Sequence, residues 1–375
     1  MIRHRLRRVH AMCLAAICLA ACSPASQPPA IPVAATSPLT GDERTPLVVF
    51  AAGSLIVPFA ELEAAYEAAH PDIDVRPEYH GSIQVIRHAT ELHEPIDVVA
   101  TADASLLPML MFQAEDPATG APYAQWACSF AGNRLALAFT DRSRYADQID
   151  SQNWPDILAR SDVLLGLADP RFDASGYRAM MALALAERQN GEFGLFNDIF
   201  DDQFIYPVRI FREEDLSTIT VPEVLETRSD SHLRLRGGSI QLLALLESGD
   251  IDYAFEYESV IRQHGLHMLQ LPPEVDLSDE AYRDRYAQAE VELDFQRFAS
   301  IEPHFVGEPI AYAITIPSSA PHPQEAAEFI AFLLGPEGSA VMQANQHPVL
   351  ENPLPLGWET MPESLQPLCA GTEGP

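Results

Sequence analysis

Residues 46–55 have the sequence PLVVFAAGSL, and this stretch decides the fold class of the chain. Its first seven residues are apolar and rich in β-formers, which predicts a buried strand that ends at Gly53. A helix is expected from about Pro58, because large apolar side chains recur at helical spacing through residues 59–69. A buried strand that leads directly into an amphipathic helix is typical of α/β proteins.

The same order continues downstream. A second strand is expected over residues 73–79, a helix over 83–92 and a third strand over 96–100. Strand–helix–strand–helix–strand order predicts a parallel sheet with right-handed crossovers. In such sheets ligands bind beyond the carboxyl ends of the strands, at helix N-termini.

The rest of the chain repeats these elements. Further strands are expected at 133–140, 163–168, 252–257 and 308–316, and helices at 176–188, 241–247 and 326–334. About 320 residues suit two packed lobes better than one core. We therefore expect a bilobal α/β fold with two mixed or parallel sheets, helices around them and a cleft between the lobes. The expected lobes are residues 46–128 plus 306–360, and residues 129–305, with a tail at 361–375.

The N-terminal residues predict export. Four arginines precede an apolar run over residues 9–21, which is too short to span a bilayer as a mature helix. This pattern indicates a secretory signal at residues 1–21. The run ends in Leu-Ala-Ala-Cys at Cys22, which resembles the lipobox of bacterial lipoproteins and implies a lipid on that cysteine. An ordinary signal peptide with an incidental cysteine is the alternative. Residues 22–45, rich in Pro, Ala, Ser and Thr, predict a flexible tether.

Composition excludes several function classes. The chain has 54 acidic and 23 basic residues, a net charge of −31, so nucleic acid and anionic membrane surfaces are not expected partners. No P-loop, Gly-x-Ser-x-Gly or His-Glu-x-x-His motif occurs, and we expect neither catalysis nor a cofactor. Cys128 and Cys369 could form one disulfide in an oxidising compartment.

Three Gly-Ser pairs stand just before predicted helices, with their serines at Ser54, Ser82 and Ser239. Glycine allows close approach of a ligand, and serine supplies a hydroxyl donor. The free N–H groups of the first helical turn favour an anion. Ordinary N-capping by serine explains any one pair taken alone. Two pairs after consecutive parallel strands are more informative, because both face the same crevice.

Two further polar segments stand out. Residues 169–178, DPRFDASGYR, form a loop that leads into a helix, and a helix cap at Asp173 or Ser175 is the simple interpretation. Glu256 and Tyr257 end a predicted strand, where a surface acid is the simple interpretation.

Together these motifs resemble a known family. The matching segments are Phe50 to Leu55, Gly81 to Gln84, Asp169-Pro170 through Arg178, and Asp252 to Tyr257. They resemble the molybdate/tungstate-binding proteins of ABC importers, with the tungstate-type branch as the closer match, over about residues 47–354. The resemblance implies a monomeric type II periplasmic binding fold. Such a protein passes one oxoanion to a permease with its ATPase, and the lipobox would hold it on the periplasmic or cell-surface side of a membrane.

The resemblance also implies site residues. Residues that would contact the oxoanion are Gly53, Ser54, Ser82, Asp173, Ser175, Glu256 and Tyr257. The carboxylates of Asp173 and Glu256 match those that bring the metal of the oxoanion to six-coordination. Asp169 stays an alternative for the first carboxylate, and Ser175 stands where the family often has Cys. Sulfate and phosphate cannot expand their coordination, so the carboxylates would exclude them.

Other interpretations remain open. Asp173, Glu256 and Tyr257 are hard oxygen ligands that would also suit a ferric-iron or other cation-binding protein of similar fold. A hydrolase would need a nucleophile–base motif, which the sequence lacks, and an adhesive or structural surface lipoprotein would not need the anion-attracting helix starts. Tungstate and molybdate have nearly the same size and charge, and the sequence does not choose between them.

Overall fold

The computed structural model describes residues 44–191, 193–294 and 303–369. The predicted signal, the lipid site at Cys22 and the tether up to residue 43 lie outside these residues, as does the end of the predicted tail. Within the described ranges, no helix combines the length and the apolar character needed to cross a membrane.

The quoted stretch forms strand β1 (Thr45–Ala52), followed by the short η1 (Gly53–Leu55) and α1 (Ile56–Ala69). Strand β1 pairs in parallel with β2 (Ile73–His80) and with β3 (Val98–Thr101). Helix α2 (Ser82–Thr90) connects β2 to β3. The predicted parallel strand–helix–strand–helix–strand unit is confirmed, and its strand ends carry Gly53 and Gly81 to the same edge of the sheet.

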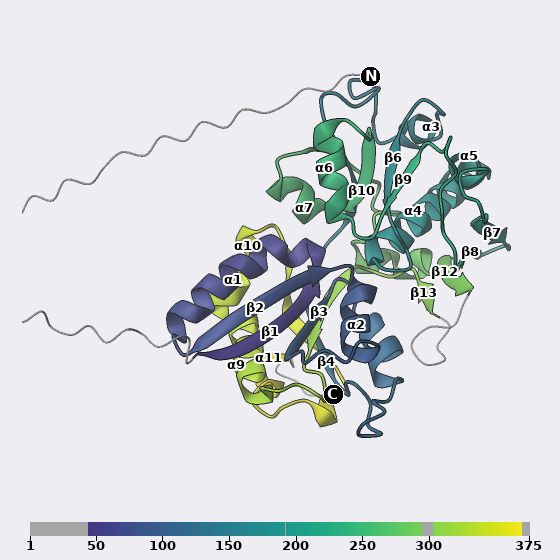
Figure 1. The fold of residues 1–375 in the computed structure, drawn as a ribbon. Helices are drawn as coiled ribbons and strands as arrows, with labels where there is room; N and C mark the ends of the chain where they lie inside the picture. The colour runs from purple at the N-terminus through teal and green to yellow at the C-terminus, as the bar shows by residue number, and fades with distance from the viewer. Residues whose placement is uncertain (1–43, 192, 295–302, 370–375) are drawn as a thin grey trace, which may run out of the picture. The chain divides into compact units, whose positions relative to one another are not determined.

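Three later strands complete this first sheet in the order β15-β4-β14-β3-β1-β2. The added strands are antiparallel to their neighbours: β4 (Ala127–Gly132), β14 (Ala311–Thr315) and β15 (Val349–Leu356). Helices α1, α9 (Pro323–Leu334) and α10 (Pro336–Ala344) pack together on one face, and α2 lies on the other (Figure 1). We call this sheet with its helices the first lobe.

A second sheet has the order β11-β5-β10-β6-β9. Its strands are β5 (Leu135–Phe139), β6 (Leu165–Ala168), β9 (Leu233–Arg236), β10 (Tyr253–Tyr257) and β11 (His267–Gln270). The helices of this region are α3 (Trp154–Leu158), α4 (Ala174–Asn190), α5 (Leu195–Phe200), α6 (Ile240–Ser248), α7 (Glu258–Gln263) and α8 (Arg283–Tyr286). Strands β9, β6 and β10 are parallel, whereas β5 runs antiparallel to β10, so the expected mixed sheet is confirmed.

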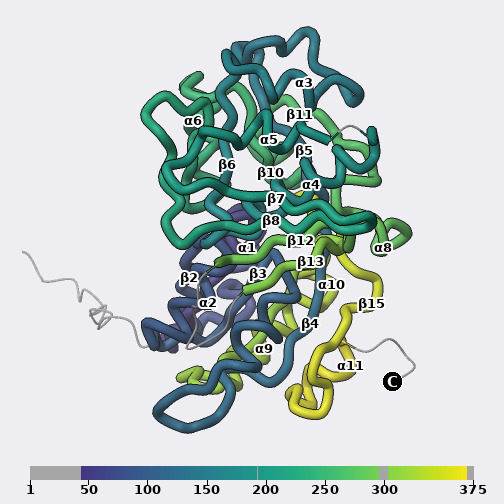
Figure 2. Tube along the Cα trace, turned by 90° about the vertical axis from the view of Figure 1, so that its right-hand side faces the viewer, coloured from purple at the N-terminus to yellow at the C-terminus, as the bar shows by residue number. Residues whose placement is uncertain are grey.

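A third sheet was not predicted, so the expectation of two sheets is wrong. Its order is β13-β12-β8-β7, and Figure 2 shows the four strands side by side. The strands are β7 (Arg209–Arg212), β8 (Ser217–Pro222), β12 (Ala289–Asp294) and β13 (His304–Val306). Helix α4 is buried continuously over residues 174–187 because it packs against β6 and β10 on one side and β8 and β12 on the other. The third sheet therefore supplies the second cover of α4. The second and third sheets with their helices form the second lobe.

The chain leaves the first sheet after Gly132 and enters the second at Leu135. The proposed lobe bounds, 46–128 with 306–360 and 129–305, stay a prediction. Helix α11 (Gln366–Cys369) lies within the segment expected to be a polar tail, and it buries Cys369.

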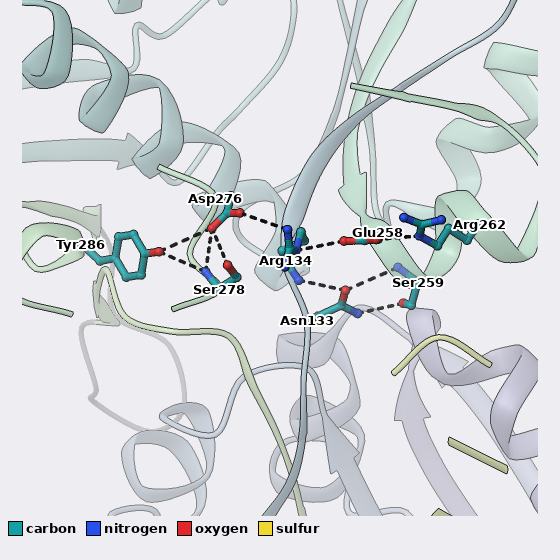
Figure 3. A network of polar contacts seen from close by, with 8 residues as sticks. All are labelled: Asn133, Arg134, Glu258, Ser259, Arg262, Asp276, Ser278 and Tyr286. Carbon is teal, nitrogen blue, oxygen red and sulfur yellow. Dashed lines mark hydrogen bonds and ion pairs between the residues drawn. The ribbon is translucent and has the colours of Figure 1, made fainter. Parts of the chain in front are cut away.

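A polar network holds this first crossing (Figure 3). The Asn133 amide donates to the hydroxyls of Ser259 (2.8 Å) and Tyr312 (3.0 Å). Arg134 pairs with Glu258 at 2.9 Å and lies 4.0 Å from Asp276. The crossing is therefore tied to α7 and to β14, which places it beside the strand ends that carry the candidate site.

Candidate functional site

Two buried serines stand at the helix starts of the first lobe. Ser54 Oγ accepts a hydrogen bond from the Tyr312 hydroxyl at 2.8 Å, and Ser82 Oγ accepts one from the Ala102 N–H at 3.0 Å. The N-cap positions are Ala52 and Gly81, so neither serine occupies the capping position. A serine hydroxyl carries one proton, and a serine that accepts from the protein keeps that proton for another partner. Both serines can therefore donate to an anion.

Asp173 begins α4 in the second lobe and is its N-cap. One carboxylate oxygen accepts from the N–H and the hydroxyl of Ser175, both at 2.9 Å, and the other accepts from the Ser239 N–H at 3.1 Å. The capping interpretation of Asp173 is thus confirmed, and the Ser175 proton is committed to Asp173. Burial raises the pKa of Asp173, and the hydrogen bonds from Ser175 and Ser239 oppose this shift.

Glu256 lies in β10 and is only 1% exposed, so the surface-acid interpretation is wrong. Its Oε1 accepts the Tyr257 N–H at 2.7 Å. Its Oε2 is buried and makes no hydrogen bond among the described residues, although the Ser239 side chain lies near enough to lower the pKa of Glu256. Burial raises the pKa of Glu256 to about 8, and the charge of Asp173 adds to the increase. Burying a carboxylate oxygen without a partner is costly, which is typical of a group reserved for a ligand.

The two lobes approach each other closely where Gly81 of the first lobe meets Phe172 and Asp173 of the second. A methyl group at Gly81 would lie 2.3 Å from the Phe172 carbonyl oxygen and 3.0 Å from the Asp173 Cβ. The same carbonyl accepts the N–H groups of Ile83 (3.1 Å) and Gln84 (3.2 Å). Two first-turn N–H groups of α2 are therefore bound by the second lobe, whereas the expectation assigned the first turn to an anion.

A buried arginine connects both lobes behind the carboxylates. The Arg178 guanidinium donates to the Ala102 carbonyl (2.6 Å) and to the Tyr257 hydroxyl (2.7 Å), and it lies 3.1 Å from Asp103. Tyr177 also donates to Asp103. The positive charge of Arg178 acts to lower the pKa of Asp173. The arrangement thus combines the carboxylates of Asp173 and Glu256, two serine hydroxyls with free protons, and one buried cation that is paired with Asp103.

The structure brings most of the predicted site residues together. Ser82 is adjacent to Asp173 through Gly81, Asp173 is close enough to Glu256 to raise its pKa, and Tyr257 follows Glu256. Ser54 joins through Tyr312, whose ring packs against that of Tyr257 with centroids 6.2 Å apart.

Two of the expected residues have other contacts. Asp169 pairs with Arg171, so Asp173 is the carboxylate that faces the first lobe. A methyl group at Gly53 would pack on Ile240 at 3.5 Å.

Sequence reasoning missed several contributors. The hydroxyl of Tyr312 and the amide of Asn133 come from distant segments, and nothing in the local pattern marks them. Asp103 stands two residues after the third parallel strand, and that position was a usable signal. Arg178 stands in the quoted loop motif but was not assigned to the site.

Comparisons with known proteins agree with this architecture. Residues 47–345 match the family model described as "Bacterial extracellular solute-binding protein". An uncharacterized solute-binding protein of Petrotoga mobilis is 34% identical over 325 residues, covering 87% of this chain and 90% of the relative. The molybdate/tungstate-binding protein WtpA of Thermococcus kodakarensis is 33% identical over 336 residues, covering 88% of each.

A solved structure shows the same fold. The periplasmic molybdate-binding protein of Azotobacter vinelandii aligns with a TM-score of 0.52 at 15% sequence identity, covering 81% of this chain and all of that chain. The bilobal periplasmic binding fold expected from the sequence is therefore confirmed. On the family match and on the relatives, this chain belongs to the bacterial extracellular solute-binding protein family.

Proposed function

We propose that this chain captures molybdate or tungstate and delivers it to the permease and ATPase of an ABC importer, without catalysis and without a cofactor. One observation carries the proposal: the buried, unpartnered Oε2 of Glu256 beside the carboxylate of Asp173. The relative named as molybdate/tungstate-binding, alike over nearly the whole chain, supports it.

The two carboxylates decide which anion fits. A carboxylate that only approaches the oxygens of a dianion opposes binding, because like charges about 4 Å apart repel even when partly screened. A carboxylate oxygen that coordinates the metal centre supports binding instead. Molybdenum and tungsten can accept two more oxygens, whereas sulfur and phosphorus cannot. Asp173 and Glu256 would therefore select molybdate or tungstate over sulfate and phosphate.

The first-lobe serines would bind the outer oxygens. Ser54 and Ser82 each keep a free proton, and hydrogen bonds to a charged acceptor are the stronger kind. Buried Arg178 reduces the repulsion that the carboxylates impose on an entering dianion. These donors and this cation favour an anion over ferric iron, which the acidic ligands alone would also suit.

Calorimetric titration of the full chain tests the proposal. We expect tight, saturable binding of tungstate and molybdate, and no measurable binding of sulfate, phosphate or ferric citrate at the same concentrations. X-ray absorption on the tungstate complex should then show six oxygen neighbours around the metal. Binding of ferric citrate alone would replace the proposal with the cation alternative. Four oxygen neighbours would reject metal coordination while leaving oxoanion capture intact.

We also propose that Cys22 carries a lipid that holds the protein on the periplasmic or cell-surface side of the membrane. The support is the Leu-Ala-Ala-Cys sequence after the apolar run at residues 9–21, together with the extracellular family. Cell fractionation and N-terminal mass of a Cys22→Ser variant test it. The variant should leave the membrane fraction or keep its signal, and an unchanged distribution and mass would reject the anchor.

A further inference from the structure

Two cysteines that lie far apart in the sequence are buried in the same core. Cys128 lies in β4 of the first lobe and Cys369 ends α11, and both side chains have zero exposure. They are the two cysteines of the part of the chain that the structure describes. Neither contributes to the candidate oxoanion site.

The path of the C-terminal segment brings these cysteines together. Strand β15 runs antiparallel to β4 and places Pro355 opposite Cys128. The chain then turns back, and α11 packs against β15 and α9, with the Cys369 N–H bonded to the Leu365 carbonyl at 3.2 Å. The Cys369 side chain lies close enough to the Cys128 thiol to raise its pKa, together with burial, and both cysteines are free thiols in the structure.

We propose that Cys128 and Cys369 form a disulfide in the exported protein. The family is extracellular, and disulfides form and persist in that kind of compartment. The two thiols together lose two protons and two electrons as the S–S bond forms. An exchangeable disulfide, on an oxidase protein or a small thiol, accepts the electrons and protons and is reduced to two thiols.

Burial determines when this reaction takes place. A buried thiol with a raised pKa forms little thiolate and is a poor nucleophile. The exchange therefore occurs while the C-terminal segment is still unfolded, before α11 covers Cys128. Once the segment has folded, the same burial shields the bond from reductants.

The position of the bond gives it a structural role. Both cysteines belong to the first lobe, and the whole second lobe lies between them in the sequence. The bond would close one long covalent loop that contains the second lobe. Closing a longer loop lowers the entropy of the unfolded chain more, and this stabilises the folded state. It would also fix α11 to the first sheet without touching the cleft, so we expect stability rather than oxoanion affinity to depend on it.

Mass mapping of the thiols in the full chain, isolated after export, tests the proposal. Cells are quenched in acid, free thiols are blocked with N-ethylmaleimide in denaturant, and the protein is then reduced and labelled with iodoacetamide. We expect Cys128 and Cys369 to carry only the second label, and an unreduced digest to contain their two peptides linked. N-ethylmaleimide on both residues would overturn the proposal, as would a linkage of either residue to another cysteine.

Matched variants separate the bond from other effects. Reduction should lower the melting temperature of the wild type, but not that of Cys128→Ser or Cys369→Ser, and tungstate affinity should stay within about twofold in all three. Equal responses of wild type and variants to reductant would reject a stabilising bond. If a variant does not fold, the wild-type peptide map still decides. Because this inference does not depend on the ligand, failure of oxoanion binding would leave it standing.

Discussion

The first-lobe and second-lobe sides of the candidate site differ in what they can offer a ligand. On the first-lobe side, Ser54 and Ser82 accept hydrogen bonds from the protein and keep their own protons. On the second-lobe side, Asp173 accepts three hydrogen bonds, whereas Glu256 keeps one buried oxygen without a partner. The first side offers hydroxyl protons to a ligand, and the second offers carboxylate oxygens together with the Tyr257 hydroxyl. Asp173 supports both the fold and the site, whereas Glu256 does little for the fold.

The largest effect is expected for Glu256→Gln, which removes the charge and keeps the shape. If Glu256 coordinates the metal, tungstate affinity should fall about 100-fold or more, equal to about 2.7 kcal/mol. If it only repels the dianion, affinity should rise, so the sign of the change decides. Calorimetry measures it. Glu258→Gln is the matched control, because Glu258 follows two residues later but pairs with Arg134 and Arg262 outside the site.

Substitution of Asp173 should reveal its double role. Asp173→Ala should weaken tungstate binding and also cost about 1 kcal/mol of folding stability through the lost helix cap. Asp173→Asn keeps a capping oxygen, so it should weaken binding with a smaller loss of stability. Both variants should discriminate less against sulfate. Chemical denaturation and calorimetry together separate the two effects.

The cap of η3 (Glu280–Tyr282) provides the control for Asp173. Asp279 accepts the Ala281 N–H there, at an exposed position. Asp279→Ala should change stability alone. An Asp173→Ala variant that loses stability but binds tungstate normally would make Asp173 a cap only.

Substitutions of Ser54, Ser82 and Ser175 should differ in their effect on tungstate affinity. Ser54→Ala and Ser82→Ala each remove a hydrogen bond to a charged ligand, worth roughly 1.5–3 kcal/mol, or about 10- to 150-fold in affinity. The Ser175 hydroxyl already donates its hydrogen bond to Asp173, so Ser175→Ala should change tungstate affinity less than about threefold. Titrations of the three variants compare them directly. Equal losses would show that free protons are not what the first-lobe side contributes.

Binding should depend on pH in a stated direction. Burial raises the pKa of Glu256 to about 8, and coordination needs the ionised form. Tungstate affinity should therefore rise about tenfold per pH unit up to about pH 8 and then level off. Titrations in two buffers of different ionisation enthalpy count the proton released. Proton uptake on binding would contradict the coordination role.

Folding stability should show the opposite trend with pH. The pKa of Glu256 is higher in the folded than in the unfolded chain, so the folded state holds the proton more tightly. Its contribution is most favourable below the unfolded pKa, near 4.5, and is lost as pH rises through about 8. Glu256→Gln should remove this dependence, which denaturation curves at several pH values would measure.

Much of the first lobe could be predicted because its signals are local. An apolar run, a Gly-Ser break and an amphipathic helix recur in order, and parallel pairing follows from connectivity. The third sheet could not be found this way, since β8 pairs with β12 from far along the chain. The alternation of threonine with apolar residues in Ser217–Pro222, which matches the alternating burial of β8, was a signal, but only the pairing partner gives the strand its position in a sheet.

The site divides along the same line. Ser54, Ser82, Asp173 and Glu256 stand at strand ends or helix starts, so local pattern and family resemblance select them. The hydrogen bonds that each of these side chains can still make depend on partners that lie far away in the sequence. Tyr312 leaves Ser54 its proton, and the Ser239 N–H fills the second oxygen of Asp173. The Gly-Ser pair marked Ser239 as a helix start, but no local pattern indicates that its N–H binds Asp173 or that Tyr312 binds Ser54.

The carbonyl of Phe172 has a kinetic consequence. It binds two N–H groups of α2 across the lobes, while Arg178 binds the Ala102 carbonyl, and the side chains between them are buried. An anion can reach those side chains only after such bonds break, so the opening rate of the lobes, rather than diffusion, limits exchange. Observed association rates should level off at high tungstate concentration. The lifetime of the closed protein then sets how long a captured anion stays before the importer takes it.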